Sequence, residues 1–334
     1  MYEAFYGLRE RPFELVPNPR FLFLTPRQRE ALSNLQYGLT TARGLTLLIG
    51  EAGTGKTTLV QAALADPSAA GVRVVLMSNP TLTRAEFFEF LARAFGLSEA
   101  AGVSKTRFLF ELRRELQERH KAGVLSALVI DEAQSIPYEL LEEIRLLSNI
   151  ETTTTKLLNV VLTGQPELSD RLNDTSLRQL KQRISLRCQL RPMELNETAS
   201  YIAGRIRIAG GRPEQVFTRE AVAAVFEASG GLPRTVNVLC DNALIGGFAS
   251  QVKPINAAFV EEVCRDFDIR DSTGSIAPVL SLPDQDAIAN EDQERQVINA
   301  PTVPSLTTGE APEVEAPATP MFGTVNRKSR FSFF

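Results

Sequence analysis

The sequence is poor in the residues on which several kinds of catalysis depend. Among its 334 residues it has one histidine, His120, and three cysteines, Cys188, Cys240 and Cys264. A lone histidine near a predicted helix end, with no nucleophile set around it, argues against Ser-His or Cys-His chemistry. The cysteines are odd in number and lack C-x-x-C spacing, which argues against a zinc site or a disulfide framework. We expect reduced, interior cysteines, as in a cytosolic protein.

Long apolar runs and a large excess of one charge are also absent. No stretch reaches about 18 apolar residues, the length that a membrane-spanning helix needs. The N-terminus carries Glu3, Arg9, Glu10 and Arg11 where a signal peptide requires an uninterrupted apolar core. The 36 basic and 40 acidic residues argue against a surface built throughout to coat nucleic acid, although a local basic patch is compatible with them. These absences predict a soluble, cytoplasmic protein.

The sequence does contain a phosphate-binding loop. Residues 50–58 match the pattern G-x-x-x-x-G-K-[ST]; a short apolar run at 45–49 precedes them and a helical pattern follows. Glycines let the loop curl so that its backbone N–H groups point at phosphate oxygens, while Lys56 adds a positive charge and the Thr57 hydroxyl can coordinate Mg²⁺. The predicted nucleotide-binding residues are Gly50, Glu51, Ala52, Gly53, Thr54, Gly55, Lys56, Thr57 and Thr58.

An apolar strand that ends in two carboxylates follows about 75 residues later. Residues 127–130 are apolar and lead directly into Asp131 and Glu132. Asp131 at the carboxyl end of a strand can hold Mg²⁺ together with Thr57, and Glu132 can orient or deprotonate the attacking water. An acidic strand end is a weak signal alone, but its pairing with the phosphate loop predicts a site that hydrolyses ATP with Mg²⁺.

Three more strands complete the pattern. Residues 72–77 read as a strand, and residues 158–162 form another that ends in polar residues. A polar side chain at this end could reach the γ-phosphate or the water; Gln165 is the preferred candidate and Thr163 the alternative. Residues 184–190 alternate as a fifth strand. Strands alternating with helices predict an α/β phosphate-loop NTPase with a five-stranded parallel sheet flanked by helices.

The composition divides the chain into four regions. Residues 1–25 are rich in aromatic residues and proline and can wrap over a domain, either as packing alone or as a cover for the nucleotide base. Residues 26–192 carry the α/β pattern. Residues 193–268 read as helices only, which predicts a small lid domain. Residues 269–334 are acidic and rich in Pro, Ser and Thr, which predicts a disordered tail.

The end of that tail has a composition of its own. Residues 326–334 hold three basic and three aromatic residues. A flexible segment with such a tip can tether a protein partner or anionic lipid headgroups, whereas the alternative is a frayed end without a role. From Asp271 onward there are nine acidic and four basic residues, so the tail accounts for the acidic balance of the whole chain.

Together these motifs resemble the AAA+ ATPases. Residues 182–184, Gln-Arg-Ile, are similar to the box in which that superfamily keeps its arginine finger, and the Gly-x-Pro-Arg of residues 231–234 resembles its sensor 2 motif. The resemblance implies a homo-oligomer in which Arg183 reaches a neighbour's γ-phosphate, and a contact between Arg234 and the nucleotide. It adds Arg183 and Arg234 to Glu132 and Gln165 as predicted catalytic residues.

Longer stretches resemble the ExeA, or general-secretion-pathway protein A, group. They are found at residues 5–13, 141–149 and 162–168, and the resemblance extends over about residues 1–267. It implies ATP and Mg²⁺ as cofactors, and partners in envelope secretion, pilus or polysaccharide-export machinery, with possible peripheral association at the inner membrane. Members of that group commonly continue into a membrane span and a peptidoglycan-binding domain. Neither pattern occurs here, so we do not expect direct wall binding.

Two alternative functions stay open at this point. The core and the Gly-Gln-Pro of residues 164–166 also resemble DNA-associated transposition ATPases such as TniB, whose DNA affinity should fall steeply with salt. The other alternative is a nucleotide-gated scaffold that binds ATP and hardly turns it over.

Overall fold

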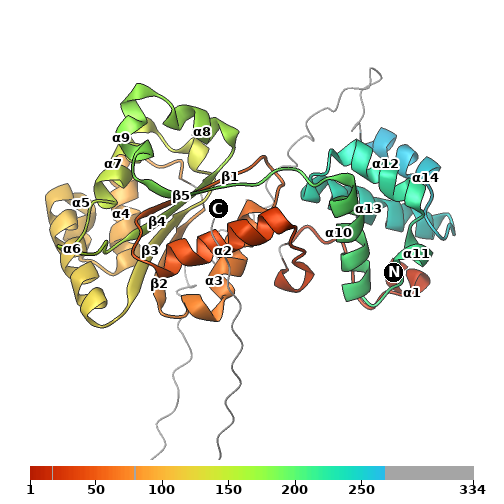
Figure 1. Cartoon of the computed structure of the whole chain (residues 1–334), viewed down its shortest axis with the longest axis horizontal. Helices are drawn as coiled ribbons and strands as arrows, with labels where there is room; N and C mark the ends of the chain where they lie inside the picture. The colour runs from red at the N-terminus through yellow and green to blue at the C-terminus, as the bar shows by residue number, and fades with distance from the viewer. Residues whose placement is uncertain (17, 79, 268–334) are drawn as a thin grey trace, which may run out of the picture. The chain divides into compact units, whose positions relative to one another are not determined.

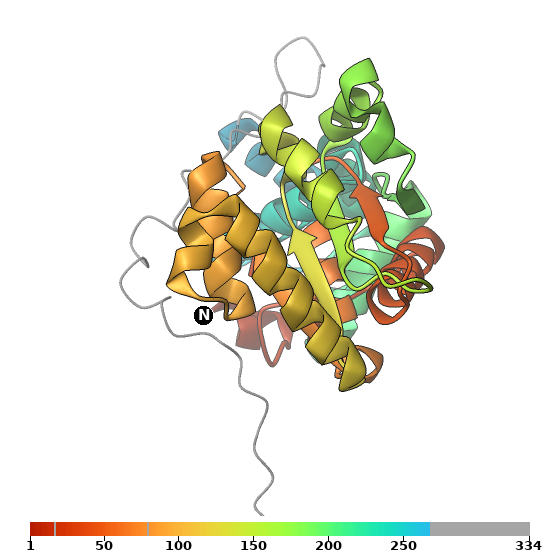
Figure 2. The same ribbon diagram turned by 90° about the vertical axis from the view of Figure 1, so that its left-hand side faces the viewer.

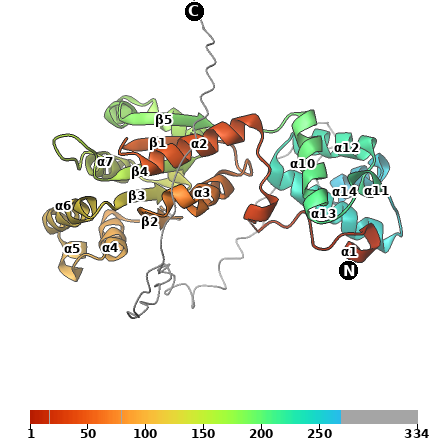
Figure 3. The same ribbon diagram turned by 60° about the horizontal axis from the view of Figure 1, so that its bottom comes forward.

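The computed structural model describes residues 1–16, 18–78 and 80–267. The predicted tail and its 326–334 end lie outside these residues. The described chain contains a five-stranded, wholly parallel sheet with the strand order β2-β3-β4-β1-β5 (Figure 3). The predicted phosphate-loop fold with five parallel strands is therefore confirmed. The strands are β1 (Leu45–Ile49), β2 (Val72–Met77), β3 (Leu125–Ile130), β4 (Asn159–Gly164) and β5 (Ile184–Gln189).

Helices cover both faces of this sheet. In the sequence they alternate with the strands, as crossover connections between parallel strands require. Figure 1 shows α2 and α3 close together, and Figure 2 shows the neighbouring helices α4, α5 and α6 in orange to yellow. The helices of this region are α2 (Pro26–Thr40), α3 (Lys56–Ala65), α4 (Arg84–Phe95), α5 (Glu99–Val103), α6 (Lys105–Lys121), α7 (Tyr138–Leu147), α8 (Pro166–Leu172) and α9 (Arg178–Lys181).

The period-two alternation of the central strands builds two cores. Leu47 and Ile49 of β1 belong to the core formed with α4, α6 and α7, whereas Leu48 belongs to the core formed with α2 and α3. All five residues of β1 are buried, and so are those of β4. The edge strand β5 is half exposed. The carboxyl ends of buried strands thus supply a rigid base for the functional site.

A separate helical core holds the N-terminal segment. Figure 1 shows α1 (Tyr2–Tyr6) beside α13 (Pro233–Ala249), and the two helices are in contact. Tyr2, Tyr6 and Phe13 are buried in this core. Tyr6 donates a hydrogen bond to the main-chain oxygen of Val252 (3.0 Å). The other helices are α10 (Leu195–Ile208), α11 (Pro213–Val216), α12 (Arg219–Ser229) and α14 (Ala257–Asp266).

Candidate functional site

The phosphate loop lies between β1 and α3. Its Gly53 and Gly55 have φ values of 80° and 91°, which L-residues rarely adopt. A Cβ on Gly53 would also lie only 2.9 Å from the Cβ of Arg234. The loop is tied to the sheet because the N–H of Gly50 donates to the main-chain oxygen of Gly164 (3.1 Å). Glycine is therefore required here both by backbone conformation and by close packing.

Lys56 begins α3 and is only 4% exposed. Its ammonium donates to the main-chain oxygens of Gly50 (3.0 Å) and Glu51 (3.1 Å). Burial lowers the pKa of Lys56, although the negative charges of Glu132 and Asp131 act in the opposite direction. No side chain caps the start of α3, so its first N–H groups and its dipole favour an anion at this end.

Asp131 lies at the carboxyl end of β3 and is held on both carboxylate oxygens. Its Oδ2 accepts from Thr57 Oγ1 (2.6 Å), and its Oδ1 accepts from the main-chain N–H of Glu132 (2.9 Å) and from Thr163 Oγ1. Thr163 is fully buried beside Asp131, while Gln165 lines the cavity. Hydroxyl and carboxylate oxygens of Thr57 and Asp131 are the donors that Mg²⁺ prefers, so this pair fits a magnesium site.

Glu132 has a left-handed backbone with φ 51°, uncommon for a residue other than glycine. Its Oε2 accepts hydrogen bonds from Gln134 Nε2 and from Gln165 Nε2 (3.3 Å). Gln134 also accepts, through Oε1, from the main-chain N–H of Gln165 (3.1 Å). The amide of Gln134 thus joins the ends of β3 and β4 around the Glu132 carboxylate. Gln134 was not predicted from the sequence, although its position two residues after Glu132 was an available signal.

The two predicted arginines lie in different places. Arg234, in the first turn of α13, donates its main-chain N–H to the oxygen of Gly53 (3.2 Å) and lines the cavity. Arg183 precedes β5, where Ile184 pairs with Leu45 at the start of β1. The loop follows the other end of β1, so Arg183 lies about 16 Å away along the strand. Arg183 does not line the cavity, and its buried Nε has no hydrogen-bond partner among the described residues.

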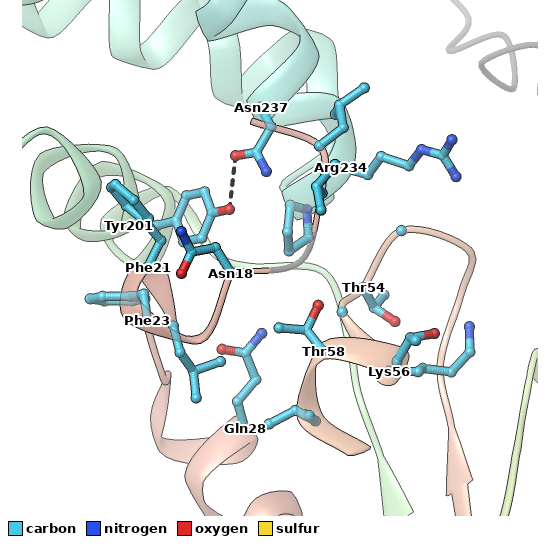
Figure 4. A pocket seen from close by; sticks show the side chains of 18 of the residues that line it. Asn18, Phe21, Phe23, Gln28, Thr54, Lys56, Thr58, Tyr201, Arg234 and Asn237 are labelled. Atoms are coloured by element: carbon cyan, nitrogen blue, oxygen red, sulfur yellow. Dashed lines mark hydrogen bonds between the residues drawn. The ribbon is translucent and has the colours of Figure 1, made fainter. Parts of the chain in front are cut away.

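A cavity of about 510 Å³ opens at the phosphate loop. One end is formed by the loop and by Glu132 and Gln165, and we call it the phosphate end. The other end, which we call the base end, is formed by the N-terminal segment, α2, α10 and α13 (Figure 4). Its labelled side chains are Asn18, Phe21, Phe23, Gln28, Tyr201 and Asn237.

Arg205 organises the base end. It is 7% exposed, and its guanidinium lies 5.0 Å from the ring centroid of Phe21. It donates to the hydroxyl of Tyr201 (2.8 Å) and to the main-chain oxygen of Pro12. Tyr201 in turn donates to Asn237 Oδ1 (2.8 Å), and burial raises the pKa of the Tyr201 phenol. These contacts join the N-terminal segment to α10 and α13.

The described residues contain neither a cluster of metal ligands nor a membrane-spanning helix. In residues 1–16, 18–78 and 80–267, no group of three or more His, Cys, Asp or Glu side chains is arranged to hold a metal ion. Within the same residues, every helix is too short or too polar to cross a bilayer.

Comparisons with known proteins agree with this geometry. Residues 39–172 match the AAA domain family. The chain is 41% identical over 253 residues to general secretion pathway protein A of Aeromonas hydrophila; the match covers 75% of this chain and 45% of that protein. The chain therefore spans about half the length of this relative.

Solved structures show the same fold at low identity. The ORC2 protein of Aeropyrum pernix, in ADPNP–ADP complexes, has a TM-score of 0.57 and 17% identity over 77% of this chain and 71% of that one. Cdc6p from Pyrobaculum aerophilum has a TM-score of 0.58 and 17% identity over 76% and 70%. Residues 39–172 of the chain thus carry an AAA domain, and three quarters of the chain is similar to general secretion pathway protein A.

Proposed function

We propose that this protein binds ATP with Mg²⁺ and hydrolyses it to ADP and phosphate. Lys56 and the loop N–H groups would hold the β- and γ-phosphates, while Thr57 and Asp131 would hold Mg²⁺. Bound Mg²⁺ would neutralise charge on the phosphate oxygens. Glu132 would orient the attacking water and accept its proton, since its carboxylate faces the cavity beside the loop.

The observation that carries this proposal is the convergence of three strand ends. The loop after β1, the carboxylates after β3 and Gln165 after β4 are joined by hydrogen bonds in the chain Thr57, Asp131, Glu132 and Gln165. A nucleotide phosphate placed at the loop would therefore meet a cation, two carboxylates and an amide at once. An isolated glycine turn would not bring these groups together.

We further propose that the active form is a homo-oligomer with sites between subunits. Arg183 precedes β5 at the end of the sheet opposite its own phosphate loop, and this distance supports a role at a neighbouring subunit. A guanidinium supplied by a neighbour would stabilise charge on the γ-phosphate in the transition state. Arg234, above Gly53, would act in its own subunit.

The relative supports a role in secretion. Its name places that protein in a general secretion pathway, and 41% identity over three quarters of this chain supports a related task here. We propose an assembly or remodelling ATPase for envelope secretion, pilus or polysaccharide-export machinery, acting at the cytoplasmic face of the inner membrane.

Two substitutions separate binding from hydrolysis. Lys56→Ala should lose ATP affinity because the charge that faces the phosphates disappears. Glu132→Gln should bind ATP and fail to hydrolyse it, because only water activation is removed. Glu139→Gln, at an exposed position of α7, is the matched control. Equilibrium ATP binding and phosphate release measure both effects.

Each result of this experiment has a distinct meaning. Normal turnover by Glu132→Gln, under conditions where Lys56→Ala is inactive, would remove Glu132 from its proposed role. A wild-type protein that binds ATP and releases no phosphate at any protein concentration would instead be a nucleotide-gated scaffold.

One observation favours DNA association as a second candidate. A separate cleft of about 310 Å³ lies between α2 and β5 and is lined by Arg27, Arg187 and Arg191, with Glu30 as its one acidic residue. Arginines without a matching number of carboxylates suit a phosphate backbone. With DNA bound in this cleft, the protein would be a DNA-associated ATPase, as the transposition ATPases are.

A salt titration of duplex DNA affinity tests this second candidate. DNA binding through the cleft should weaken steeply with salt, and Arg187→Ala should flatten the slope by about one unit. Arg114→Ala, on the exposed face of α6, is the control. A slope that is unchanged by Arg187→Ala, or no DNA binding at low salt, would exclude the cleft as a DNA site.

A further inference from the structure

Arg171, on α8, binds the turn that follows Glu132. Its Nη1 donates to the main-chain oxygen of Gln134, and its Nη2 donates to the main-chain oxygen of Ile136 (2.6 Å). Its guanidinium also lies 4.7 Å from the ring centroid of Tyr138. Arg171 is not among the residues that line the cavity, so any effect it has on a bound nucleotide must pass through the residues it holds.

The partners of Arg171 are unusual for an arginine at a partly exposed position. Among the described residues it forms no ion pair, so two main-chain oxygens and a ring face are what its charge meets. A planar guanidinium can serve two acceptors at a fixed spacing, whereas a lysine ammonium acts as a single point of charge. These contacts fix the path of the main chain at the turn.

The turn is a place where the main chain has to be held. Glu132 has a left-handed backbone and precedes a single 3₁₀ turn, Ala133–Ser135, that no side chain caps. A left-handed conformation is costly for a residue with a Cβ and persists only where the surrounding structure imposes it. The N–H of Ser135 closes the turn from inside by donating to the oxygen of Glu132 (2.9 Å). Arg171 holds the same turn from outside.

The helix that carries Arg171 is itself fixed to the end of β4. It begins directly after Gln165, whose amide donates to the Glu132 carboxylate (3.3 Å). Leu168 of this helix is fully buried, and a Cβ on Gly164 would lie only 2.7 Å from its Cδ2, so the helix and the strand end pack closely. Arg171 therefore ties the turn after β3 to the element that positions Gln165.

We propose that Arg171 is a positioning residue for ATP hydrolysis, because it holds the turn that aims the Glu132 carboxylate at the attacking water. The inference rests on the proposed function, in which Glu132 activates that water. Without Arg171 the turn is free to relax, and the carboxylate moves away from its productive position. A displaced general base slows the chemical step and leaves the phosphate contacts of the loop intact. The loss should therefore fall on kcat and spare ATP affinity.

The first test compares kcat and the ATP dissociation constant of the whole chain with those of Arg171→Met. This variant keeps the apolar stem and removes both donors, so kcat should fall by about tenfold while the dissociation constant stays within about twofold. Arg171→Lys keeps the charge and can reach one oxygen, so it should recover part of the loss. Arg93→Met, on α4, where the side chain is 81% exposed and pairs with Glu89 (2.9 Å), is the control and should match the wild type.

A second test separates positioning of Glu132 from a general weakening of the fold. Arg171→Met is combined with Glu132→Gln, and the residual turnover is measured by release of labelled phosphate. If Arg171 acts through the Glu132 carboxylate, the double variant should be no slower than Glu132→Gln alone. A purely structural role would lower the rate by the same factor in both backgrounds. Tyr138→Leu, which removes the ring and leaves both hydrogen bonds, should lower kcat by about threefold at most.

Three results would overturn the positioning role while the proposed function stands. These are a wild-type kcat in Arg171→Met, a loss of ATP affinity that equals the loss of kcat, and a further fall in rate in the Glu132→Gln background. If Arg171→Met does not fold, Arg171→Lys in the same two backgrounds decides the question. By contrast, a wild type that releases no phosphate, or a Glu132→Gln protein with normal turnover, would overturn the proposed function itself.

Discussion

The two ends of the cavity are built in different ways. The phosphate end comes from short segments that each end a neighbouring parallel strand, so the sheet places them together. The base end is assembled from two regions that are far apart in sequence, the N-terminal segment with α2 and the helices α10 and α13. Chemistry at the first end depends on charge and hydroxyl groups, whereas the second end offers amides and rings. We infer that Glu132 and Gln165 at the first end set the turnover rate, whereas the second end adds to the nucleotide affinity that Lys56 and the loop provide.

Replacing Arg183 should have the largest effect on ATP turnover. Arg183 lies at neither end of the cavity, so its effect tests whether the two ends alone account for turnover. Arg183→Ala should reduce ATP turnover by on the order of a thousandfold while ATP affinity changes little, since a finger acts on the transition state. Turnover and binding are measured on the assembled protein. Arg178→Ala, at an exposed position of α9, should retain the wild-type rate.

Mixing variants tests whether Arg183 acts in trans. Arg183→Ala subunits lack the arginine, and Lys56→Ala subunits lack the phosphate site, so mixed assemblies should recover part of the activity. Absence of recovery in assemblies that demonstrably form would contradict action between subunits. A specific rate that does not depend on protein concentration would argue against the oligomer.

Replacing Gln134 should have the next largest effect on ATP turnover. It tests whether the position of the Glu132 carboxylate at the phosphate end controls the rate. Gln134→Leu keeps the side-chain size but removes the bonds to Glu132 and to the N–H of Gln165. Turnover should fall by on the order of tenfold to a hundredfold, as for a misplaced general base, with ATP affinity unchanged. Gln61→Leu, at an exposed position of α3, is the control. A change in affinity alone would contradict the positioning role.

The sequence predicted the strands of the fold better than its short helices. All five strands were expected within two residues of their observed bounds, because period-two patterns and apolar runs report burial directly. The helices α1, α5, α7, α8, α9 and α11 were not expected. All but the ten-residue α7 have four to seven residues, too few for a helical period to become visible, and tertiary packing sets them.

Of the candidate site, the phosphate end was accessible to sequence reasoning, whereas at the base end only the N-terminal segment was considered, as a cover for the nucleotide base or as packing alone. The loop at 50–58 and the pair Asp131 and Glu132 are contiguous motifs whose geometry follows from strand and turn rules. Tyr201 and Asn237 meet only when α10 packs beside α13, and neither residue type is diagnostic alone. Gln165 and Thr163 differ in ways that the sequence does not show: Thr163 is fully buried and donates to Asp131, whereas Gln165 lines the cavity and donates to Glu132.

Replacing Arg205 should have the smallest effect on ATP turnover. It tests whether the base end acts on stability and nucleotide affinity without changing the rate. Arg205→Met should lower the free energy of unfolding by about 2–4 kcal/mol, because the buried oxygens of Pro12 and Tyr201 lose their donor. Nucleotide affinity should fall with it, while turnover at saturating ATP stays within about twofold of wild type. Arg207→Met, exposed on α10, is the control for thermal unfolding. Unchanged stability would remove Arg205 from its organising role.

The central claim is tested most directly by measuring kcat and the ATP dissociation constant together for Glu132→Gln and Asn237→Asp. We predict opposite patterns: Glu132→Gln should lose kcat by at least about a hundredfold with its dissociation constant nearly unchanged, and Asn237→Asp should bind ATP about tenfold more weakly with kcat nearly unchanged. Two variants that change the same quantity, or a Glu132→Gln protein that hydrolyses ATP at the wild-type rate, would contradict the account.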